Sequence, residues 1–222
     1  MINKLAVFDF DSTLMDGETL EFFAEELGIR EQIKSITDKA MQGELDFFES
    51  LTERVGLLKG LSLEKVDEIS HSLPLMKGAF EVVKGLKERG YKVVCFSGGF
   101  RNATSYFAEK LGLDGEYANI LHSKDGVLTG LVGGEMMFNN SKGEMLKRLQ
   151  KMLEITEENT LVVGDGANDL SMFKYAGKRI AFCAKPILEK EANIVIKEKD
   201  LSLILESPLL WVQMILLRFN LL

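Results

Sequence analysis

The sequence predicts an α/β fold in which a doubly wound parallel sheet carries an inserted helical lobe. Short apolar runs that end in small or acidic residues alternate with segments whose apolar residues recur at helical spacing. This alternation is typical of a parallel sheet wound with helices. It is interrupted once, between about Glu18 and Leu73, where helical patterns follow one another without a convincing strand. The interruption predicts the lobe.

The apolar runs give the expected strands, at residues 5–8, 92–96, 160–163, 180–182 and 194–196. Between them, residues 78–89 and 141–153 have helical periodicity with start or stop signals, and they are expected to be helices of the core. The dipeptide Asp125-Gly126 lies between two strand-like runs. Because this pair favours a two-residue turn, it predicts a β-hairpin within residues 119–137.

The lobe is expected to contain four helices, marked by apolar residues within 20–27, 33–41, 47–55 and 63–73. It follows the first strand directly, so it should lie beside Asp9, as a lid over a substrate requires. The predicted division is therefore a core of residues 1–15 and 75–206, a helical-bundle cap of residues 16–74, and an apolar C-terminal extension of residues 207–222.

Composition excludes several classes of function. The 34 acidic residues outnumber the 27 basic ones, and the net charge of -7 argues against a nucleic-acid groove. With two histidines, no CxxC pair, and two cysteines (Cys95 and Cys183) in apolar runs, an imidazole or thiolate zinc site is excluded and both cysteines are expected to be buried. The N-terminal residues lack the pattern of a secretory signal, so a cytoplasmic location is expected.

Polar residues follow three of the predicted strands. Asp9 and Asp11 follow the first, Ser97 with two glycines follows the second, and the third is followed by the segment 164–169, which contains Asp165 and Asp169. Ligands of open parallel sheets bind at this edge. Four carboxylates there would repel each other by about 4 kcal/mol per close pair. A cation is needed, and an oxygen-only donor set favours Mg²⁺.

Magnesium held by carboxylates commonly also binds a phosphate group, and the remaining motifs suit one. Ser97, Gly98 and Gly99, expected to form a strand-to-helix turn, offer a hydroxyl and backbone amides. Lys142, at the start of a predicted helix, offers a positive charge. Each motif alone has an ordinary structural explanation, but their joint occurrence at strand ends indicates phosphoryl transfer.

In these motifs the sequence resembles the haloacid dehalogenase superfamily of phosphatases, and within it the phosphoserine phosphatases. The resemblance covers roughly residues 4–205, and it is carried by the segments DFDSTL at 9–14, SGGF at 97–100, KG at 142–143 and GDGAND at 164–169. It implies a Rossmann-like core and Mg²⁺-dependent hydrolysis of O-phosphoserine to serine and phosphate, which is the last step of serine biosynthesis.

The resemblance also assigns roles to individual residues. It implies that Asp9 is the nucleophile, which forms an aspartyl-phosphate, and that Asp11 is the acid and later the base. The expected magnesium ligands are Asp9, Asp165 and the main-chain carbonyl of Asp11, with Asp169 and Asn168 in support. The expected substrate contacts are as follows: Ser97, Gly98, Gly99, Lys142 and Asn168 near the phosphate, Glu18 at the ammonium, Arg54 at the carboxylate, and Met41 and Phe47 on the apolar side.

Three other functions are consistent with parts of this pattern. The same chemistry could act on another small phosphorylated metabolite or transfer the phosphate to another alcohol. A signalling receiver also combines acidic residues, magnesium and an aspartyl-phosphate, but the order of the motifs and the helical lobe argue against it. A binding protein without activity is disfavoured because every motif residue is present.

The extension at 207–222 is more apolar than the resemblance leads us to expect. It is too short and too interrupted for a transmembrane helix. Packing against the body of the protein or against a partner subunit in a homodimer is expected, with contact at a membrane surface as the alternative.

Overall fold

The computed structural model describes residues 4–41, 44–208 and 210. Seven strands form one sheet in the order β4-β3-β2-β1-β5-β6-β7, and all neighbours are parallel except the antiparallel pair β3 and β4. The strands are β1 (Lys4–Phe8), β2 (Tyr91–Phe100), β3 (Gly115–Lys124), β4 (Val127–Gly134), β5 (Thr160–Gly164), β6 (Lys178–Phe182) and β7 (Ile194–Ile196). The predicted α/β fold is confirmed.

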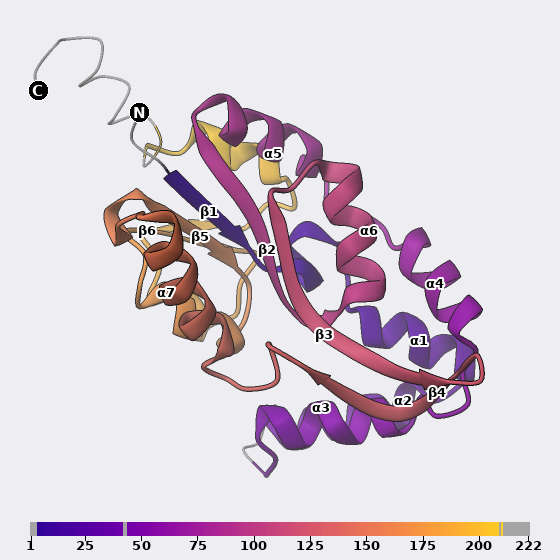
Figure 1. The fold of residues 1–222 in the computed structure, drawn as a ribbon. Coiled ribbons are helices and arrows are strands. Elements are labelled where there is room, and N and C mark those ends of the chain that lie inside the picture. Colours follow the sequence, from indigo (N-terminus) through magenta and orange to yellow (C-terminus); the bar gives the residue numbers. More distant parts are fainter. Residues whose placement is uncertain (1–3, 42–43, 209, 211–222) are drawn as a thin grey trace, which may run out of the picture.

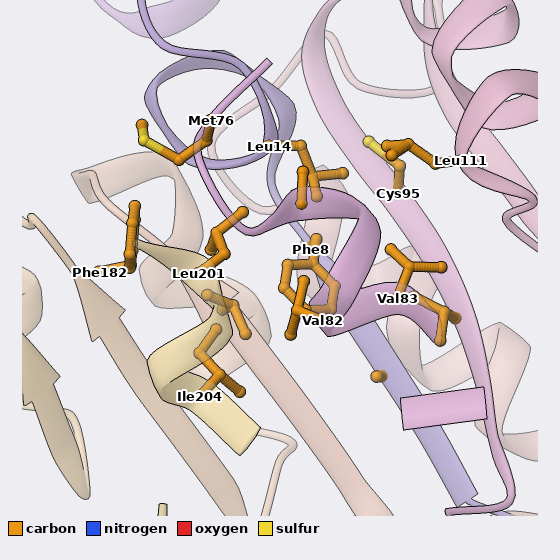
Figure 2. Close-up of a cluster of buried hydrophobic side chains, with 14 of the residues drawn as sticks. Phe8, Leu14, Met76, Val82, Val83, Cys95, Leu111, Phe182, Leu201 and Ile204 are labelled. Carbon is orange, nitrogen blue, oxygen red and sulfur yellow. The ribbon is translucent and has the colours of Figure 1, made fainter. Parts of the chain in front are cut away.

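Strand β1 lies at the centre of the sheet because both of its faces are apolar. Its residues 5–8 are fully buried, and they alternate between two clusters. Ala6 and Phe8 join the cluster drawn in Figure 2, whereas Leu5 and Val7 join a second cluster on the opposite face. Such a strand is typical of a sheet covered on both sides.

Helices cover the two faces. Helices α5 (Ala79–Glu88) and α6 (Arg101–Leu111) pack on the side of Phe8, with the 3-10 turn η4 (Leu201–Glu206). On the other side lie α7 (Ser141–Leu153), α8 (Leu170–Phe173) and α9 (Pro186–Glu189). Figure 1 shows α5 and α6 on one side of the sheet and α7 on the other. The two core helices predicted at 78–89 and 141–153 are confirmed.

Between β1 and β2 the chain forms α1 (Thr19–Leu27), α2 (Arg30–Met41), α3 (Phe47–Gly56) and α4 (Leu63–Ser72), as the periodicity predicts. Their apolar residues share a core with Phe100 at the end of β2 and with Leu121 and Leu128 of the β3-β4 hairpin. The lobe therefore packs against the hairpin. The division at residues 16–74 stays a prediction, and so does the role of the 207–222 extension, of which 209 and 211–222 lie outside the described residues.

The two predicted turns have different outcomes. The hairpin turn is confirmed, since Asp125 and Gly126 both have positive φ values, 52° and 78°. The turn expected at Ser97-Gly98-Gly99 is wrong, because these residues continue β2 and α6 begins only at Arg101. Phe100 pairs with Asn119 of β3 and is buried in the core of the lobe, so the strand stays extended past the glycines.

The two cysteines differ in burial. Cys95 is buried as expected, while Cys183 is only partly covered, at a positive φ of 45°. None of the helices within the described residues combines the length and apolar character that crossing a bilayer requires.

Candidate active site

Asp9 is fixed at the carboxyl end of β1 by the sheet itself. Its N–H donates to the carbonyl of Val163 at 2.9 Å, which extends the pairing of β1 with β5 by one residue. The chain then turns through η1 (Phe10–Leu14), where Ser12 has a positive φ of 58°. Asp9 is 3% exposed, so its carboxylate is buried at the centre of the sheet edge.

Lys142 lies between two of the carboxylates. It is 3% exposed, and its Nζ donates to Asp9 Oδ1 at 2.5 Å and to Asp169 Oδ1 at 2.6 Å. Gly143 lets α7 approach α8 closely, because a Cβ there would lie 2.5 Å from the carbonyl oxygen of Ser171. Burial lowers the pKa of Lys142, but the charges of Asp169 and Asp9 outweigh burial and raise it above its ordinary value. The ammonium group therefore stays charged.

Asp169 organises the loop that follows β5. It is fully buried, and its Oδ2 accepts the N–H groups of Asp165 at 3.0 Å and Gly166 at 3.1 Å. A Cβ on Gly164 would lie 2.3 Å from the same oxygen, so this position admits only glycine. Because Lys142 occupies Oδ1, both oxygens of Asp169 already accept hydrogen bonds. This arrangement explains the spacing of the GDGAND segment.

The donor set at this edge fits a hard divalent cation. Carboxylate oxygens of Asp9, Asp165 and Asp169 lie within 4.8 Å of one another. One ammonium group faces three carboxylates, which leaves an excess of negative charge at this edge. Burial, followed by the charge of Asp169, raises the pKa of Asp9 well above its ordinary value and that of Asp165 to about 6. A cation would relieve this repulsion.

Asp11 is held by the first residue of α1. Its Oδ1 accepts the backbone N–H of Thr19 at 2.7 Å and the Thr19 hydroxyl at 2.6 Å. Burial raises the pKa of Asp11, and both Thr19 hydrogen bonds oppose that rise. On the other side a Cβ on Gly99 would lie 2.7 Å from Asp11 Oδ2, so glycine makes room for the carboxylate. Sequence reasoning did not find Thr19, although its place at the start of α1 was a usable signal.

Ser97 and Gly98 line the same edge from β2. Ser97 is fully buried, and its Oγ accepts the N–H of Gly99 at 2.8 Å. Phe47, from the first turn of α3, lies on Gly98, since a Cβ on that glycine would be 2.9 Å from Cζ of the ring. The structure thus brings the predicted aromatic residue of the lobe against the predicted phosphate-binding residues of the core.

The predicted specificity residues of the lobe lie near the acids. Glu18 is exposed and accepts the hydroxyl of Ser12 at 2.7 Å. Arg54 is partly buried, and its Nε donates to the carbonyl of Ser50 at 3.1 Å. Burial lowers the pKa of Arg54, while the charges of Glu18 and Asp11 oppose this shift, so the guanidinium shares the field of both carboxylates.

The last two predicted site residues are Asn168 and Met41. Asn168 is partly exposed within the turn η3 (Ala167–Asp169), next to the metal-site loop. The side chain of Met41 lies outside the described residues.

Comparison with known proteins places this geometry in a family. Residues 3–177 match the model of the haloacid dehalogenase-like hydrolases. The chain is 60% identical to the phosphoserine phosphatase of Wolinella succinogenes, over 91% of this chain and 98% of the relative. It is 52% identical to that of Methanocaldococcus jannaschii, over 91% and 96%.

Solved structures agree with these relatives. A phospho-aspartyl intermediate analogue of phosphoserine phosphatase superposes with a TM-score of 0.88 at 51% identity, covering 93% of this chain and 99% of that one. A substrate-bound phosphoserine phosphatase gives a TM-score of 0.88 at 50% identity, covering 93% and 98%.

Proposed function

We propose that this chain hydrolyses O-phosphoserine with Mg²⁺ through an aspartyl-phosphate on Asp9. The chain belongs to the haloacid dehalogenase-like hydrolases and is a phosphoric monoester hydrolase of the phosphoserine phosphatase type. The observation that carries the mechanism is the pairing of buried Asp9 with Lys142, beside a second carboxylate, Asp11, that has its own donors. One acid is thereby set up as nucleophile and the other as proton carrier.

In the first step, a carboxylate oxygen of Asp9 attacks phosphorus as the bond from phosphorus to the serine oxygen breaks. Asp11, protonated at this stage, gives its proton to the departing oxygen, and serine leaves. Burial favours the protonated form of Asp11, which suits this role. Lys142, Ser97 and the amide of Gly98 hold the phosphoryl oxygens, and Gly99 and Asn168 complete their surroundings.

In the second step, Asp11 takes a proton from water as the water oxygen bonds to phosphorus. The bond from Asp9 to phosphorus breaks, phosphate leaves, and both carboxyl groups return to their starting states. Mg²⁺, held by Asp9, Asp165 and the main-chain carbonyl of Asp11, would supply positive charge between anionic groups. Asp169 supports that site through its hydrogen bonds to the loop.

Specificity for phosphoserine would come from the lobe. Glu18 suits the substrate's ammonium group, Arg54 suits its carboxylate, and Phe47 closes the apolar side together with Met41. This activity would place the chain at the last step of serine biosynthesis.

A panel of phosphomonoesters with Mg²⁺ tests the proposal. We expect phosphoserine to exceed simple sugar phosphates by more than about tenfold in kcat/KM, because only phosphoserine engages both Glu18 and Arg54. Arg54→Ala should erase this preference, whereas Arg30→Ala, which breaks an exposed ion pair with Glu21, should leave it intact. Equal rates for all monoesters would assign the same chemistry to another metabolite.

A further inference from the structure

We propose that Asn119, a buried residue of β3, is a positioning residue for this reaction, which orients Ser97 and anchors the loop that leads to Lys142. The inference rests on the function proposed above and extends it to a residue outside the known motifs. Asn119 is fully buried at the point where β3 passes the end of β2. Every hydrogen-bonding atom of its side chain is engaged.

The amide of Asn119 joins two backbone segments. Its Nδ2 donates to the carbonyl of Gly98 at 3.0 Å and to the carbonyl of Met136 at 3.1 Å, and its Oδ1 accepts the N–H of Met136 at 3.0 Å. Gly134, at a φ of +145°, makes this possible, since a Cβ there would lie 2.7 Å from the Cα of Asn119. The local sequence is therefore built around this amide.

The bond to Gly98 bears on the phosphate site through a single peptide plane. The carbonyl of Gly98 and the N–H of Gly99 belong to the same planar unit, so fixing one fixes the other. That N–H donates to Ser97 Oγ at 2.8 Å. A hydroxyl has one proton and two lone pairs. With one lone pair occupied by the amide of Gly99, the proton of Ser97 is directed toward an acceptor in the site, such as a phosphoryl oxygen.

The bonds to Met136 bear on the opposite wall of the site. Met136 is the second residue of the segment that runs from β4 to α7, and Lys142 lies in the first turn of that helix. By holding both the donor and the acceptor of Met136, Asn119 sets where this segment leaves the sheet. One buried amide therefore fixes the spacing between the hydroxyl and the ammonium group that would bind the phosphate.

Gln150 provides a matched control. It is 8% exposed, and its Nε2 donates to Thr160 Oγ1 at 2.9 Å and to the carbonyl of Tyr175 at 2.8 Å. It is thus another buried amide that joins two segments, but its partners are remote from the carboxyl edge of the sheet. If Asn119 only stabilises the fold, replacing either amide should have the same consequences.

The experiment compares Asn119→Leu with Gln150→Leu at a temperature where both remain folded by circular dichroism. For Asn119→Leu we expect kcat to fall about 10- to 100-fold, with a smaller change in KM, and Mg²⁺-dependent affinity for inorganic phosphate to fall about tenfold by calorimetry. For Gln150→Leu we expect changes within about twofold in both quantities. Equal losses in the two variants, or unchanged kcat and phosphate affinity in Asn119→Leu, would overturn the proposal.

A measurement on the unaltered protein covers the case in which Asn119→Leu does not fold. The side-chain amide NMR signals of Asn119 should shift when beryllium fluoride and Mg²⁺ are added, while those of Gln150 should not. Unshifted Asn119 signals in a protein that binds the analogue would contradict the inference. If phosphoserine is not the substrate, the phosphate and beryllium fluoride arms still test Asn119, so the two proposals fail separately.

Discussion

Asp9 is the residue on which the chemistry depends, and replacing its charged oxygen tests this directly. We expect Asp9→Asn to reduce kcat by at least about 10⁴-fold, because an amide cannot form the acyl phosphate. The fold should persist, since the backbone of Asp9 is held by Val163 and the side chain stays close to isosteric. Steady-state kinetics and circular dichroism measure the two effects. A variant that keeps full activity would refute the nucleophile assignment.

Glu18 predicts a pH dependence of substrate binding. Loss of water around the carboxylate, followed by the charge of Asp11, raises its pKa to about 7. Below its pKa Glu18 is neutral and loses its attraction for an ammonium group. The ratio of kcat/KM between wild type and Glu18→Gln should therefore fall as pH decreases through about 7.

The ratio removes a confounding titration, because the phosphate of the substrate itself titrates near pH 6 in both enzymes. A phosphorylated hydroxy acid without the amino group serves as the control substrate, for which the ratio should not change with pH. A pH-independent ratio for phosphoserine would show that Glu18 does not meet the ammonium group.

At the scale of elements, the sequence predicts well what depends on local pattern and poorly what depends on neighbours. The buried run at 5–8 and the hairpin at Asp125 required no tertiary information. The extension of β2 through Gly99 depends on tertiary contacts, because Phe100 packs in the core of the lobe. Asn119 could not be found from the sequence for the same reason, since its importance lies in hydrogen bonds to Gly98 and Met136, which belong to other segments of the chain.

The first turn of α3 also joins the lobe to the core. Its capping box orients the turn, with Asp46 and Glu49 each accepting the other's backbone N–H. Phe48 then stacks on Phe138 of the segment before α7, with ring centroids 5.3 Å apart and an interplanar angle of 12°. Phe48 and Phe138 are 40% and 58% exposed, so solvent reaches both residues beside the stacked contact.

A double-mutant cycle measures this contact. From Phe48→Ala, Phe138→Ala and the double variant we expect a coupling of about 0.5–1 kcal/mol in the free energy of unfolding by urea. The control pairs Phe48→Ala with Phe80→Ala, an exposed ring on α5, which Figure 1 shows far from α3. Those two should be additive within about 0.5 kcal/mol. Additivity of the first pair would mean that the stacking does not join lobe and core.

At the scale of the whole molecule, the fold brings together, at the carboxyl edge of the sheet, site carboxylates that are spread along the sequence from Asp9 to Asp169. The lobe leaves and rejoins the core through adjacent segments, since Met15 bridges to Leu75 and the N–H of Asp16 donates to the carbonyl of Pro74 at 2.9 Å. The insertion therefore leaves the centre of the sheet undisturbed. What remains unfavourable is the density of negative charge at the carboxyl edge, in a protein whose net charge is already -7.

Because of this negative charge, we expect the site to lower the free energy of unfolding until a cation binds. Burial, followed by the charge of Asp169, raises the pKa of Asp165 in the folded protein to about 6, against 3.8 for the free group. The folded state thus retains a proton that the unfolded chain releases, so without metal the stability should decrease as pH rises from about 4 through about 6. Mg²⁺ at about 100 times its Kd should restore about 2.7 kcal/mol, or about 5–10 °C in Tm.

Asp165→Asn separates stability from activity. Without divalent cations at pH 7.5 we expect its Tm to exceed that of the wild type, because a repelled carboxylate has been removed. At pH 4 this advantage should vanish, since Asp165 is then largely protonated in the folded wild type. The variant should also lose the Mg²⁺-induced rise in Tm together with its turnover. Thermal melts with and without Mg²⁺ at the two pH values decide it, and a wild-type Tm above that of the variant at pH 7.5 without metal would show that Lys142 already compensates the charge.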